Sequence, residues 1–102
     1  MGKYEEHRNS LLDMSNDLKR IQRGKLGLRD SIETLEAIAI YIKVRMLGED
    51  DQKSWPKVPI GKVSLTTISK QLRDIATCKV DDFEAHEILR QIVGALYGNT
   101  HN

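Results

Sequence analysis

The side chains that could perform acid–base or metal chemistry are few and scattered in this sequence. The three histidines, His7, His86 and His101, stand far apart along the chain. Two ligands on one helix must be three or four residues apart to meet the same metal ion. Asp82, His86 and Arg90 do recur at four-residue steps, but a row of charge pairs on a helix surface accounts for that spacing. We therefore predict no metal site and no cofactor.

The candidates for nucleophilic and phosphate chemistry are equally weak. Cys78 and His86 could form a nucleophile and its base, but nothing in the sequence supplies a third group to orient the base. A lone thiol near a helix end is usually a small buried hydrophobe. The string GKVS at 61–64 resembles the end of a phosphate-binding loop, but Pro56 stands where that motif needs a glycine. We expect that the protein is not an enzyme.

A cluster of cations is the first feature that could bind a partner. Five basic residues lie within 19–29 with no acid among them, and an earlier arginine falls on the same helical face. Such a face could contact nucleic-acid phosphates. The alternative is a solvated face whose cations complement the helix dipole, with nearby acids diluting its potential. The candidate phosphate-binding residues are Arg8, Lys19, Arg20, Arg23, Lys25 and Arg29.

Bulk composition limits the class of protein. A chain of 102 residues predicts a single domain over 1–102. The residues are 39% hydrophobic and 30% charged, with a formal net charge of +1, which excludes a disordered polyelectrolyte. The single cysteine cannot form an internal disulfide and favours a reducing, cytoplasmic setting. The apolar stretch 37–47 is too short to cross a bilayer and contains Lys43 and Arg45, so we predict no membrane association.

Four segments have the periodicity of amphipathic helices, which predicts an all-α protein built as a small helical bundle. The first spans about 4–23 and the third about 64–77. The second begins at a capping box formed by Asp30 and Glu33 and ends near residue 47, before Gly48. The fourth follows a second capping box at 81–84 and ends at Gly98.

The second segment has a competing interpretation as a β-strand. Apolar residues alternate over 38–46, and several of them are β-branched. In this alternative the protein is α+β, and residues 57–63 form the other strand of a hairpin. Both prolines lie in 49–61, which predicts a loop there, with Trp55 pinning it to the core.

As a helix, the second segment is apolar on nearly all sides, and only Glu36 and Lys43 form a polar strip. A helix of this kind is either central or buries its second face against a partner. The residues of this second face, which are candidates for self-association, are Ala37, Ile40, Val44 and Leu47.

Three functions follow as expectations. The first is a non-enzymatic protein-interaction or regulatory protein that forms a homodimer through its second helix. The second is a nucleic-acid-binding protein that contacts phosphates through the cluster at 19–29. The third, a small immunity or inhibitor protein, rests on the size of the bundle alone.

Overall fold

The computed structural model describes residues 3–48 and 64–100, and within these ranges it contains helices and no strand. The prediction of an all-α bundle is therefore confirmed, and the hairpin alternative is wrong because residues 38–46 are helical. Residues 57–63 and Trp55 lie outside the described residues. The elements are η1 (Glu5–His7, a 3-10 turn), α1 (Arg8–Gln22), α2 (Leu28–Ile40), η2 (Tyr41–Met46, a π-helical segment), α3 (Leu65–Ala76) and α4 (Asp82–Thr100).

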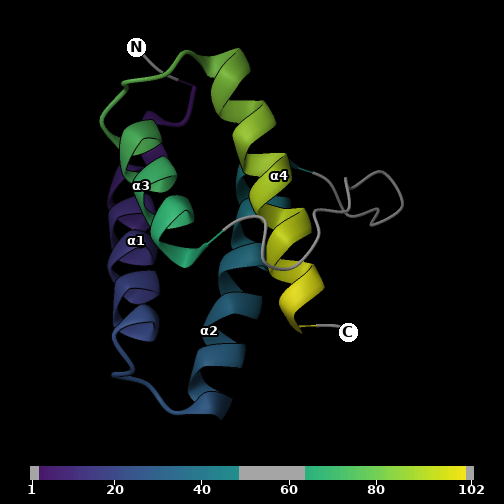
Figure 1. Cartoon of the computed structure of the whole chain (residues 1–102). Coiled ribbons are helices and arrows are strands. Elements are labelled where there is room, and N and C mark those ends of the chain that lie inside the picture. The colour runs from purple at the N-terminus through teal and green to yellow at the C-terminus, as the bar shows by residue number, and fades with distance from the viewer. Residues whose placement is uncertain (1–2, 49–63, 101–102) are drawn as a thin grey trace.

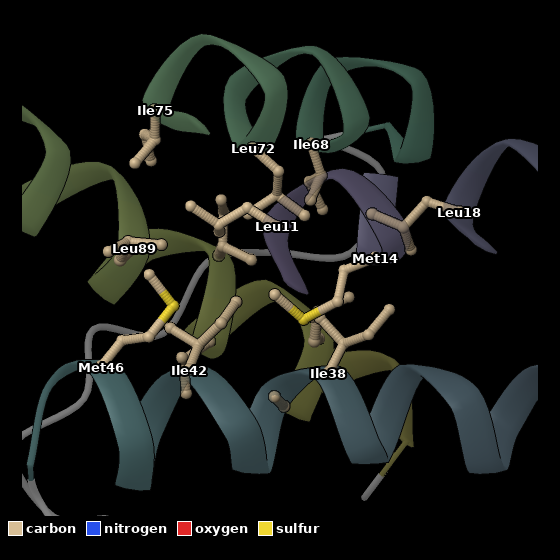
Figure 2. Close-up of a cluster of buried hydrophobic side chains, with 14 of the residues drawn as sticks. Leu11, Met14, Leu18, Ile38, Ile42, Met46, Ile68, Leu72, Ile75 and Leu89 are labelled. Carbon is tan, nitrogen blue, oxygen red and sulfur yellow. The ribbon is translucent and has the colours of Figure 1, made fainter. Parts of the chain in front are cut away.

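The helices pair across the chain rather than with their sequence neighbours. α1 packs chiefly against α3, and α2 packs chiefly against α4 (Figure 1). The two pairs enclose one apolar core, into which side chains from all four helices project (Figure 2). In Figure 2, Ile38, Ile42 and Met46 point from α2 and η2 toward the side chains of α1 and α3.

α1 and α3 meet at a pair of buried serines. The Ser15 and Ser69 hydroxyl oxygens are 2.7 Å apart, and each lies 2.9 Å from the other residue's backbone carbonyl oxygen. The two hydroxyl groups have only two protons for these three short contacts. One hydroxyl therefore donates to the other hydroxyl, and the second hydroxyl donates to a backbone carbonyl oxygen. Both residues are almost fully buried, and their small size lets the two helix backbones approach closely.

The starts of α3 and α4 follow the sequence, whereas α1 begins at Arg8, after the 3-10 turn η1, rather than near residue 4. Ser64 caps α3, because its Oγ accepts a hydrogen bond from the Thr67 N–H at 3.1 Å. Asp81 caps α4 in the same way, accepting from the Glu84 N–H at 2.7 Å. The predicted cap at Asp30 is wrong: α2 begins one turn earlier, with Gly27 as its extended N-cap residue.

The helix ends depart from the prediction at α4, which continues past Gly98 to Thr100. Gly24 and Gly48 both follow a helix in the left-handed conformation, with φ of +71° and +66°. Cys78 takes the same conformation after α3, with φ of 58°, and its side chain is exposed. The expectation of a buried thiol is therefore wrong.

Candidate functional site

The second face of α2 is exposed as a line of apolar side chains. Ile40 and Val44 keep 47% and 44% of their surface accessible, and Ala37 is also exposed. Steps of three and four residues place them in a row on the helix; we call Ala37, Ile40 and Val44 the α2 strip. Two large apolar side chains of the strip are thus accessible, while the loop and Trp55 that could cover this face in the alternative of a central helix lie outside the described residues. Leu47, the fourth candidate, is half-buried and packs against the core instead.

Lys43 lies in the π-helical segment η2 and does not extend the polar side of the helix. Within η2, the Leu47 N–H donates to the Ile42 carbonyl oxygen, five residues earlier, at 2.9 Å. This wider turn rotates the last residues relative to an α-helix. Lys43 is only 6% exposed, so the predicted polar strip of Glu36 and Lys43 is wrong at its second member.

A groove of about 350 Å³ runs between α1 and α2, beside the α2 strip. Met14 and Ile38 are the buried apolar residues in its lining, while Asp13 and Asp17 line it from α1. Ala37 belongs to both the groove and the strip, so the two features are continuous. The remaining lining residues are hydroxyl-bearing: Ser10, Thr34 and Tyr41.

Two tyrosine–histidine contacts join the elements at one end of the bundle. His7 Nδ1 lies 2.8 Å from the Tyr41 hydroxyl, and the Tyr4 hydroxyl lies 3.4 Å from His86 Nδ1. The backbone N–H of Lys3 donates to Asp82 Oδ1 at 2.9 Å. The helix face that carries Asp82 and His86 therefore receives the N-terminal segment. Burial and the nearby Asp82 carboxylate raise the pKa of the Tyr4 phenol.

The structure gathers five of the six predicted phosphate-binding residues and separates the sixth. The cluster at 19–29 surrounds the turn between α1 and α2, whereas Arg8 begins α1 at its opposite end (Figure 1). Two of the five face acids of their own helix: Arg20 lies 3.7 Å from Asp17, and Arg29 lies 3.5 Å from Glu33. Arg23 and Lys25 are fully on the surface, where Gly24 turns the chain.

The remaining candidates for chemistry are not brought together. Cys78 is exposed in the turn after α3, while His86 contacts Tyr4 on the face of α4. Within the described residues, no three histidine, cysteine or acidic side chains gather in a group that could hold a metal ion, and no helix is long and apolar enough to cross a membrane.

Sequence reasoning missed the groove and the tyrosine–histidine contacts. Asp13 and Asp17 were considered only as nearby acids that weaken the potential of the basic cluster. Their four-residue spacing, however, places them on one face of α1. Tyr4 and His86 are 82 positions apart, and no local signal connects them. Comparison of the chain with protein-family models, with curated proteins and with solved structures gives no match.

Proposed function

We propose that this protein is a non-enzymatic interaction protein that forms a homodimer through α2. The observation that carries the proposal is the exposure of Ile40 and Val44 in one row, next to a groove with an apolar floor. Single exposed apolar residues are ordinary on protein surfaces. A row of them beside a groove is a contiguous surface that pairing with a second copy removes from water.

Sedimentation velocity over a range of concentrations tests the homodimer. We expect the wild-type protein to shift from monomer to dimer as concentration rises, and the Ile40→Asp and Val44→Asp variants to stay monomeric with unchanged helical circular dichroism. Phe83→Asp is the matched control, because Phe83 is a large exposed side chain, 78% accessible, on another helix. A wild-type protein that is monomeric at every concentration would contradict the proposal.

A second candidate function, nucleic-acid binding, is favoured by the gathering of cations around the α1–α2 turn. Lys19, Arg23 and Lys25 make no ion pair within the described residues, so that their charges are not offset by a neighbouring carboxylate. Cations of this kind can neutralise backbone phosphates with little dependence on base sequence.

Titration with duplex DNA and with RNA at several salt concentrations tests this second function. Each phosphate contact contributes about 0.9 to the slope of log affinity against log salt for duplex DNA. We expect Arg23→Gln and Lys25→Gln each to lower that slope, and Arg8→Gln, at the far end of α1, to leave it unchanged. A slope near zero for the wild-type protein would exclude the function.

A further inference from the structure

The end of the bundle that carries the α1–α2 turn combines cations with an exposed apolar side chain. Leu28, the first residue of α2, is 80% accessible, the highest value among the large apolar side chains that the structure describes. In a helix each Cα–Cβ bond tilts toward the N-terminus, so this side chain leans toward the turn. Single exposed apolar residues are ordinary, but Leu28 stands within the cation cluster at 19–29.

Cations outnumber acids around Leu28. Residues 17–33 contain five cations and three acids, so that the net charge of this end is positive. Asp17 and Glu33 each contact an arginine of their own helix. The remaining acid, Asp30, follows Leu28 by two residues, a rotation of about 200° around the helix axis. It therefore lies on the opposite side of α2 and does not offset the charge next to the leucine.

The turn leaves its backbone open to a partner. A Cβ at Gly24 or at Gly27 would meet no atom beyond the neighbouring residues within 4 Å, so both positions face open space. A large polyanion can approach the turn there without displacing a side chain. Residues 17–33 contain no aromatic side chain, which rules out stacking of unpaired bases by this segment. The surface therefore fits a nucleic-acid duplex better than a single strand.

The apolar part of this surface is only one side chain wide. Ile32, one turn further along α2, is 39% accessible, and Leu26 is half-buried. A helix that binds the surface of a bilayer presents a whole apolar face to the lipid. A single exposed leucine among cations is instead the arrangement with which architectural proteins open one base step of a DNA duplex from the minor groove.

We propose that Leu28 inserts between two base pairs of a DNA duplex while the cations of the α1–α2 turn contact the flanking phosphates. This inference rests on the second candidate function, nucleic-acid binding, and specifies how the duplex is held. The free energy gained by burying one leucine side chain is of the same order as the cost of unstacking one base step. That cost is lowest where base pairing is already disturbed. The preferred ligand is therefore duplex DNA with a weakened step, such as a mismatch.

Two DNA duplexes of equal length and charge, one fully matched and one with a single central mismatch, test the inference. We expect the wild-type protein to bind the mismatched duplex at least about fivefold more tightly, because less unstacking remains to be done. Leu28→Ala should lose this preference and keep the salt dependence of binding. Arg23→Gln should lower the salt slope and keep the preference.

Phe83→Ala is the matched control. Phe83 is 78% accessible and lies at the start of α4, at the opposite end of the bundle from the α1–α2 turn (Figure 1). We expect this variant to retain both the preference and the salt slope. A fluorescent base analogue placed next to the mismatch gives a second measurement: its emission should rise on binding of the wild-type protein, as the base unstacks, and should not rise with Leu28→Ala.

The outcomes separate the insertion from the binding on which it rests. Equal affinity for the two duplexes, with the salt slope retained, overturns the insertion and keeps nucleic-acid binding. A preference that Leu28→Ala leaves intact also overturns the insertion. A flat salt response with both duplexes overturns nucleic-acid binding itself. Binding to vesicles of phosphatidylcholine and phosphatidylserine that Leu28→Ala abolishes, without any response to DNA, overturns the proposal in favour of a lipid partner.

Discussion

Cys78 and Gly24 occupy the same backbone position at the ends of two different helices. After α3, the Lys79 N–H donates to the Asp74 carbonyl at 2.9 Å and the Cys78 N–H to the Ile75 carbonyl at 3.2 Å. The same pair of bonds closes α1, with Gly24 as the left-handed residue. This arrangement favours glycine, because a Cβ crowds the following carbonyl in the left-handed conformation.

Replacing the cysteine with glycine should therefore stabilise the protein. We expect Cys78→Gly to raise the free energy of unfolding by about 0.5–1 kcal/mol, the strain relieved less the greater entropy of unfolded glycine. Urea denaturation monitored by circular dichroism measures the change. Cys78→Ala removes the thiol but keeps the Cβ, so a comparable gain in that variant would show that backbone strain is not the cause.

Tyr4 makes the free energy of unfolding depend on pH in the alkaline range. Its phenol has a pKa raised above the ordinary value of 10.0 by burial and by Asp82. The folded state therefore retains the proton at a pH where the unfolded state loses it. Stability is fully present below the ordinary pKa and falls as pH rises through the raised value.

The Tyr4→Phe variant isolates this effect. We expect the unfolding free energy of the wild type to fall relative to that of the variant as pH rises from about 8 to about 11, around the ordinary tyrosine pKa. Parallel urea titrations across this range measure the difference, and other groups that titrate there contribute equally to both proteins. A difference that stays constant with pH would contradict the assignment to Tyr4.

At the scale of elements, the sequence predicted the features of the helices that depend on interactions between residues close together in the chain. The caps of α3 and α4 depend on side chains within three residues of the helix start. The cap of α4 was predicted, whereas for α3 only a start near Ser64 was predicted. The start of α2 was not, because an additional turn gives the Ser31 N–H a partner in the Gly27 carbonyl at 2.9 Å. The π-helical segment was not predicted either. Lys43, which is buried, lies within that segment, and no pattern in the sequence marks it.

Substitutions at Ser15 and Ser69 test how much the contact between these two side chains contributes to the packing of α1 against α3. We expect Ser15→Ala and Ser69→Ala each to cost about 1–2 kcal/mol, because each leaves the other serine with fewer partners in a buried site. The double variant should cost less than the sum by about 1 kcal/mol, since the two hydroxyls act as a unit. Urea denaturation of all four proteins completes the cycle. Strictly additive losses would show that the hydroxyls do not interact.

At the scale of the whole molecule, periodicity predicted which faces are buried but not what they contact. The stripe of Leu11, Met14 and Leu18 is buried as expected. Its main packing partner is α3 rather than the adjacent α2, and no pattern within α1 could specify that preference. The groove between α1 and α2 lies where these two helices, although neighbours in the chain, have only limited direct contact.

A fragment ending at residue 48 should consequently fail to fold. It contains α1 and α2 but lacks α3 and α4, against which these helices bury most of their apolar surface. We expect weak helical circular dichroism and no cooperative urea transition, as for isolated helices of about 15 residues. The full chain under the same conditions is the control. A cooperative transition in the fragment would mean that the α1–α2 contact suffices for folding.

The pairing of α1 with α3 also affects how the chain behaves while it is being synthesised. Ser69 leaves the ribosome 54 residues after Ser15. At translation rates of 5–20 residues per second, this corresponds to a delay of roughly 3–11 s. Throughout that interval the nascent first helix lacks α3, the helix against which it chiefly packs. We expect chaperones that recognise exposed hydrophobic segments to bind the first helix during this interval. A substitution that destabilises the third helix should prolong that exposure without altering the first helix.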